Sequence, residues 1–104
     1  MATSRIDLLL GFIREKPADP FPRYALAMEY KNGARLDEAT QIFDELMTTS
    51  PDYTATYLHA GNVLVALGRV DDARAVYTRG IAVCARLGDT HTGGELEGAL
   101  GNLG

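Results

Sequence analysis

The sequence predicts an all-α protein built from about six short helices, and three observations support this prediction. Apolar residues recur at intervals of three and four along most of the 104 residues, which is the spacing of one helical face. No segment between turn signals alternates apolar and polar residues over the length of a strand. Prolines and glycines divide the chain into short segments, whose tight connections make antiparallel neighbours.

The first predicted helix covers about residues 5–16. Ser4 is suited to its start, because a hydroxyl accepts a hydrogen bond from a free backbone amide. Three prolines then break the chain, at Pro17, Pro20 and Pro22. The expected inner face consists of Ile6, Leu9, Leu10 and Ile13.

Five further helices are predicted, each bounded by a glycine, a proline or a capping carboxylate. The pairs Asp37–Glu38 and Asp71–Asp72 fall in first turns, where carboxylates face the positive end of the helix dipole. In order, the helices cover about residues 22–32, 36–49, 54–67, 70–87 and 91–103. Their expected inner residues are Leu26, Ala27 and Tyr30, then Ala39, Ile42, Phe43 and Leu46, then Tyr57, Ala60, Gly61 and Leu64, then Ala73, Val76, Tyr77, Gly80, Ile81, Cys84 and Leu87, and finally Leu96, Ala99, Leu100 and Leu103.

An internal repeat with a period of 34 residues connects these helices. Shifting the chain by that period superposes residues 34–39 on residues 68–73. Small residues at positions 27, 39, 61 and 73 would let the two helices of each pair approach closely. Phe43 and Tyr77 would fill the space where one pair stacks on the next.

This period and these residues resemble the tetratricopeptide-repeat family over about two-thirds of the chain. The resemblance implies helix-turn-helix repeats stacked as a short right-handed solenoid, forming one domain over residues 1–104. It places repeat 1 at 20–53 and repeat 2 at 54–87, with an N-terminal capping helix in 1–18 and a C-terminal capping helix in 89–104. Two residues depart from the family pattern. Arg23 stands at a tryptophan position, which weakens the packing of its helix, and Gly80 replaces an alanine at a cost of about 1 kcal/mol.

Composition excludes several classes of function. Fourteen acidic against ten basic residues give a net charge of −4, so we expect no nucleic-acid partner. The apolar part of the first helix is too short to span a membrane and no cleavage site follows it, so we expect a cytoplasmic protein without a membrane partner. A single cysteine leaves no intramolecular disulfide and no structural zinc site, and we expect neither a metal nor a cofactor.

The reactive residues do not converge, so the sequence predicts no enzyme activity. In an antiparallel pair turning near Gly68, His59 and Cys84 differ in height by roughly 10 Å. Cys84 is interpreted as a small core residue. The segment 89–92 is interpreted as a capped helix start, and the glycines at 93, 94 and 98 lack the preceding strand of a phosphate loop.

The resemblance implies a binding surface instead. In this family the first helix of each repeat lines a concave groove that takes an extended peptide or a helix of a partner protein. Asn62 either holds a ligand's backbone amide with its own amide, or is a helix residue without a ligand. Tyr24 and Met28 stand where a carboxylate clamp would be, which favours an apolar ligand and an adaptor or scaffold function. The expected partner-binding residues are Phe21, Tyr24, Met28, Lys31, Leu58, Asn62 and Val65.

The alternative is a self-associating structural subunit, such as a homodimer. Two repeats are fewer than the three usually needed for a stable stack, and the first helix carries Leu8 and Phe12 beside its main apolar face. Glycines are also concentrated after residue 87. The last helix is therefore expected to be weak by itself, to be held by Leu96, Leu100 and Leu103, and to fray first.

Overall fold

The computed structural model of the chain describes residues 4–104, which form six α-helices and no strand. This confirms the predicted all-α class and the stacked helix pairs of a repeat solenoid. Residues 1–3, part of the predicted N-terminal capping segment 1–18, lie outside the described residues. The helices are α1 (Arg5–Glu15), α2 (Pro20–Asn32), α3 (Leu36–Thr49), α4 (Ala55–Ala66), α5 (Val70–Leu87) and α6 (Thr90–Gly101).

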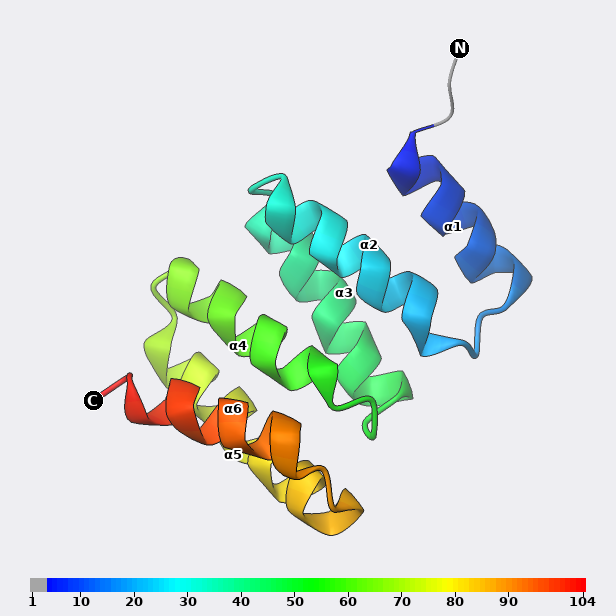
Figure 1. The fold of residues 1–104 in the computed structure, drawn as a ribbon. Coiled ribbons are helices and arrows are strands. Elements are labelled where there is room, and N and C mark those ends of the chain that lie inside the picture. The colour runs from blue at the N-terminus through cyan, green and yellow to red at the C-terminus, as the bar shows by residue number, and fades with distance from the viewer. Residues whose placement is uncertain (1–3) are drawn as a thin grey trace.

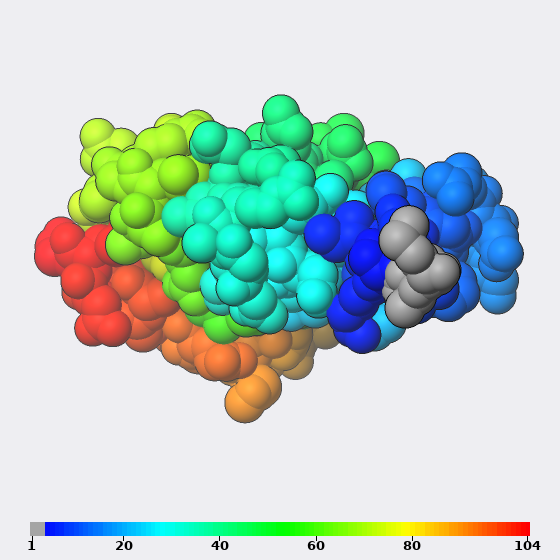
Figure 2. Space-filling view, turned by 90° about the horizontal axis from the view of Figure 1, so that it is seen from above, coloured from blue at the N-terminus to red at the C-terminus, as the bar shows by residue number. Residues whose placement is uncertain are grey.

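The helices are stacked in chain order, so that the two ends of the chain lie at opposite ends of an elongated molecule (Figures 1 and 2). Its principal dimensions are 47 × 29 × 19 Å. Each helix packs against the next, α2 also contacts α4, and α4 also contacts α6. Within residues 4–104, α3 and α5 share no close backbone contact. Because α4 contacts both α2 and α6, whereas α3 and α5 are farther apart, the helices α2, α4 and α6 form the inner layer of a curved stack.

The repeat is visible in the hydrogen bonds that begin its second helices. The backbone N–H of Arg35 donates to Tyr30 O at 2.8 Å, and that of Arg69 donates to Leu64 O at the same distance. The Arg35 guanidinium contacts Glu38 at 2.6 Å, and the equivalent Arg69 contacts Asp72 at 2.9 Å. The first-turn carboxylates are thus paired with an arginine at the same position of each repeat.

The expected break at Pro20 and Pro22 is wrong, because both prolines lie in the first turn of α2. A proline is accepted there, since the first backbone amides of a helix have no partner within it. The Asp19 carboxylate accepts a hydrogen bond from the Phe21 N–H at 3.0 Å and caps this start. The helix therefore begins two residues earlier than the sequence predicts.

One turn position differs between the two repeats in a way that affects stability. Gly68 has φ +78°, and Ala34, one period earlier, has φ +59°. A side chain in this left-handed conformation costs about 1 kcal/mol. We therefore expect Ala34→Gly to raise the free energy of unfolding by a few tenths to about 1 kcal/mol, measured by urea denaturation. Gly68→Ala is the matched control and should lower the free energy of unfolding by a similar amount. Changes of the same sign in the two variants would contradict this account.

The core lies between the helix pairs and includes most of the predicted inner residues, with Phe43, Tyr57 and Leu96 fully buried. The expected penalty at Gly80 has a compensating contact. A Cβ at Gly80 would lie 2.5 Å from Tyr57 Cβ and 2.8 Å from Leu96 Cδ1, so glycine makes room for both side chains.

Two expectations fail at the ends of the stack: Leu87 and Leu10 are exposed, because no helix covers those faces among the described residues. The buried residues that periodicity missed are Pro22, Met47, Thr56 and Val63.

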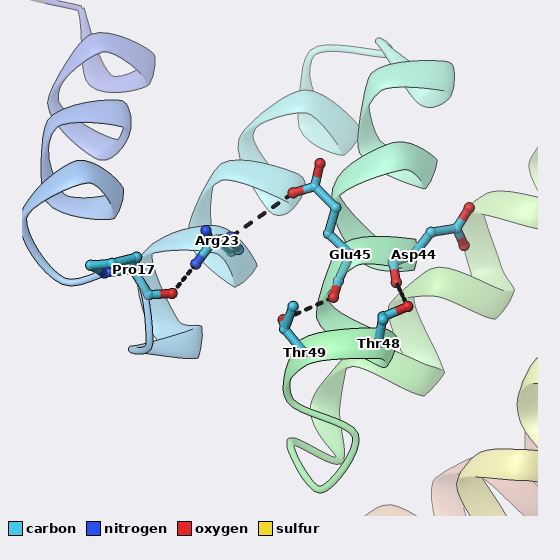
Figure 3. Close-up of polar contacts among 6 residues, drawn as sticks. All are labelled: Pro17, Arg23, Asp44, Glu45, Thr48 and Thr49. Atoms are coloured by element: carbon cyan, nitrogen blue, oxygen red, sulfur yellow. Dashed lines mark hydrogen bonds and ion pairs between the residues drawn. The ribbon is translucent and has the colours of Figure 1, made fainter.

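Arg23 makes polar contacts in place of the aromatic packing that the family pattern would supply. Its guanidinium donates to the carbonyl of Pro17, in the α1–α2 connection, and lies 3.9 Å from Glu45 on α3 (Figure 3). On α3, the hydroxyls of Thr48 and Thr49 donate to backbone carbonyls one turn earlier, at 3.0 and 2.8 Å. Arg23 thus ties the connection from α1 to the first repeat.

Candidate protein-interaction groove

The predicted partner-binding residues lie on the inner-layer helices α2 and α4. Phe21 is 60% exposed at the start of α2, and Val65 is 38% exposed near the end of α4. Leu58 is half-buried and packs against the core, so only part of its side chain is available to a ligand. The other predicted residues are Tyr24, Met28 and Lys31, all half-buried, and Asn62, which is exposed.

An aromatic cluster forms where α2 and α4 meet. The Tyr24 ring lies 5.4 Å from the ring of Tyr53 and 5.8 Å, edge to face, from the ring of His59. Burial raises the pKa of Tyr24 and of Tyr53. Tyr53 comes from the connection before α4, so helical periodicity gave no signal for it. The cluster offers a ligand rigid, mainly apolar surface with hydroxyl groups at its edge.

Lys31 and His59 join the two helices beside this cluster. Nζ of Lys31 lies 3.2 Å from Nδ1 of His59. Lysine has only donors, so Nδ1 must accept, and the ring must be neutral to do so. Burial of the imidazole lowers the pKa of His59, and the positive charge of Lys31 lowers it further, whereas Glu95 opposes both effects.

The lowered pKa of His59 predicts a loss of stability in mild acid. Below the unfolded-state value of about 6.5, the unfolded chain binds a proton that the folded protein resists, so stability falls as pH falls. We expect His59→Gln to flatten the dependence of the unfolding free energy on pH between about 7.5 and 5. Urea titrations at several pH values measure this. A slope that His59→Gln leaves unchanged and that His91→Gln removes would contradict the assignment.

Asn62 has a structural partner, which changes its expected role. Its side-chain Oδ1 accepts a hydrogen bond from the hydroxyl of Tyr77 at 2.5 Å. One of the two lone pairs of the oxygen expected to meet a ligand's backbone amide is therefore engaged by α5, so a ligand can use the second lone pair and the amide nitrogen.

The third inner helix, α6, also contributes to this surface, although the predicted binding residues all lie on α2 and α4. A hollow of about 270 Å³ lies between α4, α5 and α6. Its place in the stack follows from the contact of α4 with α6, which no local sequence signal reveals. It is lined by Asn62, Val65, Tyr77, Ala99, Asn102 and Leu103.

The candidate catalytic residues have structural surroundings. Cys84 is buried, and burial raises the pKa of its thiol, which disfavours the reactive thiolate. Asp89 caps α6 by accepting from the Thr92 N–H at 3.1 Å, as predicted for a capped helix start. It also accepts from the Thr54 hydroxyl at 2.7 Å, which ties the start of α6 to the start of α4. Residues 4–104 contain no group of three side chains arranged to hold a metal ion.

Comparison with known proteins identifies the class to which this fold and groove belong. Residues 32–83 match the family model described as tetratricopeptide repeat. That match spans half of the chain, and the protein therefore belongs to the tetratricopeptide-repeat family. Domains of this family generally mediate protein–protein interactions and are typically non-enzymatic scaffolds. No curated protein matches the chain significantly.

Solved structures show the same fold. The crystal structure of a tetratricopeptide repeat domain protein from Salinibacter ruber is 40% identical, with a TM-score of 0.78 over 82% of this chain and 94% of that one. A solution structure of such a protein from Salinibacter ruber, also 40% identical, has a TM-score of 0.80 over 85% and 89% of the two chains. A protein from Bordetella parapertussis, 20% identical, shares the fold with a TM-score of 0.83 over 98% and 89%.

Among residues 4–104, every helix is too short or too polar to cross a bilayer.

Proposed function

We propose that this protein is a non-enzymatic adaptor or scaffold that binds an apolar peptide or helix of a partner protein in its inner groove. The observation that carries this proposal is the apolar and aromatic surface of α2 and α4, which has the exposed Phe21 and Val65 on its two helices and the Tyr24–Tyr53–His59 cluster where the helices meet. Large exposed apolar side chains on neighbouring helices are typical of surfaces that another protein covers. The free thiol of Cys84 supports a reducing, cytoplasmic setting for this function.

The ligand that fits best presents apolar or aromatic side chains. The rings of Tyr24 and Tyr53, 5.4 Å apart and tilted by 51°, give a rigid aromatic contact surface, and Met28 on α2 adds an adaptable side chain. Lys31 is engaged with His59, so it offers less to a ligand carboxylate than an unpaired lysine would.

The proposal is tested by adding peptides to the isotope-labelled protein and following its amide NMR signals. The probe is a set of short peptides with aromatic and aliphatic side chains at helical or extended spacing. Shifts confined to α2, α4 and α6 are expected, and Phe21→Ser should weaken binding at least about tenfold, as for a hot-spot residue. Val70→Ser, an exposed apolar residue on α5, is the matched control and should leave binding unchanged.

Two results would contradict the groove assignment. One is a set of shifts confined to α3 and α5, and the other is the absence of shifts with all peptides. Asn62→Ala is unsuitable as a groove variant, because it also removes the acceptor of the Tyr77 hydroxyl. A loss of binding in that variant would not separate a ligand contact from a change in the fold.

A second candidate function, a self-associating structural subunit, is favoured by a specific observation. Leu8 and Phe12 stand one turn apart on α1 and are each 51% exposed. Association of two copies would remove both side chains from water. Sedimentation equilibrium tests this function: a mass above that of one chain is expected, and a strict monomer contradicts it.

A further inference from the structure

The two terminal helices stand out because each has only part of the packing of an equivalent helix within the repeats. Helix α1 packs on α2 in the way that α3 packs on α4, as the second helix of a repeat packs on the next one. Helix α6 packs on α5 and on α4, as α4 packs on α3 and on α2. Among the described residues, α1 therefore has no first helix beside it, and α6 has no second helix.

The exposed side chains of α1 are those that the missing neighbour would cover. One period of 34 residues after Leu8 and Phe12 come Ile42 and Leu46 on α3. Ile42 packs against the core and Leu46 is fully buried, whereas Leu8 and Phe12 are half exposed. The burial differs because α3 packs on the first helix of its own repeat, α2, and α1 has no such helix beside it among the described residues.

The side of α6 that no second helix covers among the described residues forms a groove with small residues in its lining. A hollow of about 330 Å³ lies between the end of α5 and the start of α6. Ala85, Gly93 and Gly94 line it, and a Cβ at Gly94 would meet no atom within 4 Å. This is where the second helix of a third repeat would lie.

We propose that α1 of one copy docks in the groove between α5 and α6 of a second copy, so that the two chains together complete a repeat. The inference rests on the self-association proposed above and names its interface. Because the two surfaces are different, the contact is head-to-tail and leaves a vacant groove and a vacant α1 at the ends of each assembly.

The sizes of the facing side chains support this pairing. Within repeat 2, the Tyr57 ring packs over Gly80, a large residue on a small one. Two periods before Gly80 stands Phe12. Superposing Leu96, the buried residue of α6, on Ala60 and the partly buried Leu100 on Leu64 shifts the chain by about 36 residues, two more than the repeat period, and places Gly93 at the position of Tyr57. At the interface between two copies, Phe12 would thus pack over Gly93. The large residue would be on the second helix and the glycine on the first, the reverse of Tyr57 and Gly80 within repeat 2.

The charges of the two segments are also complementary. Residues 5–16 carry three basic and two acidic side chains, whereas residues 89–104 carry three acidic ones and neither lysine nor arginine. With Phe12 opposite Gly93 in antiparallel helices, Lys16 lies one turn beyond Phe12 and Asp89 one turn before Gly93. The register therefore brings Lys16 next to Asp89, an acidic residue that lines the groove.

A complementation experiment tests this interface by analytical ultracentrifugation up to about 1 mM protein, since one helix in one groove makes a small contact. Phe12→Glu blocks the α1 side, and Gly94→Leu fills the groove. Each variant alone should sediment as a monomer, and their equimolar mixture should form a dimer and nothing larger. Wild type should grow beyond a dimer with concentration.

The controls keep a failure to fold from mimicking a failure to associate. Both substituted positions are open to solvent, and thermal melts followed by circular dichroism verify that each variant is folded. Val70→Glu alters an exposed apolar residue at the far end of α5, away from the groove, and should associate like wild type. Phe21→Ser should do the same, because peptide binding and association use different surfaces.

Two outcomes would overturn the proposal. If Gly94→Leu dimerises like wild type and the mixture shows no added species, then α1 pairs with α1 and the head-to-tail interface is wrong, although self-association stands. If wild type remains a monomer at every concentration, both self-association and this interface are wrong, while the peptide-binding function is untouched.

Discussion

Replacing Gly61 by alanine is expected to lower the free energy of unfolding by about 2–3 kcal/mol. The added Cβ would lie 2.1 Å from Cε1 of Tyr77, closer than any real contact between these atoms. The ring has little room to move, because Tyr77 is buried and its hydroxyl donates to Asn62. The pair α4–α5 must therefore separate or the ring must leave its position.

Urea denaturation measures this effect, and two variants make it specific. Gly94→Ala changes a helical glycine with open space around it, so it should stabilise the protein by about 0.5–1 kcal/mol. Shortening Tyr77 to leucine in the Gly61→Ala background should cost less than the sum of the two single changes, because the clash is removed. A Gly61→Ala variant as stable as wild type would contradict the packing described for this position.

Replacing Leu96 by alanine is expected to cost about 2–4 kcal/mol and to act mainly on α6. Leu96 is the fully buried apolar residue of this helix. Its side chain packs closely against Gly80, where a Cβ would leave no room for it. Helix α6 also contains four glycines, so little intrinsic helical stability remains once this anchor is shortened.

Amide hydrogen exchange locates this effect along the chain. In wild type, α6 should exchange faster than α2 to α5, and Leu96→Ala should increase exchange in α6 and the facing end of α5. Leu87→Ala is the control, since its side chain is largely exposed and its loss should change stability by less than about 0.5 kcal/mol. Uniform protection of all six helices in Leu96→Ala would show that α6 does not depend on this residue.

Local patterns in the sequence predicted the elements well. The spacing of apolar residues and the glycines at turns place α3 and α5 at the residues where the structure has them. The 34-residue period predicted the paired helices and the positions of Ala39 and Ala73, which are both fully buried. These features depend on residues close together in the chain, so one sequence is enough to find them.

Most of the differences between prediction and structure arise from contacts between residues distant in the sequence. The role of Gly80 depends on Tyr57 and Leu96, and the acceptor of Asn62 depends on Tyr77, none of which is a sequence neighbour. The groove was predicted on two helices, whereas its hollow is closed by α6, which joins the inner layer only by packing on α4. The start of α2 differs for a local reason, because a proline in the first turn of a helix does not break it.

The terminal helices α1 and α6 pack on different helices, and this affects whether a substitution at one end of the molecule is felt at the other. Among residues 4–104, helix α1 contacts only α2, and α6 contacts only α4 and α5, in a structure 47 Å long. Substitutions at the two ends share no partner, so their effects on stability should add. In the proposed assembly, loosening or occupying one end should therefore leave the affinity of the other end unchanged. Each chain would then be a link whose two ends bind independently of each other.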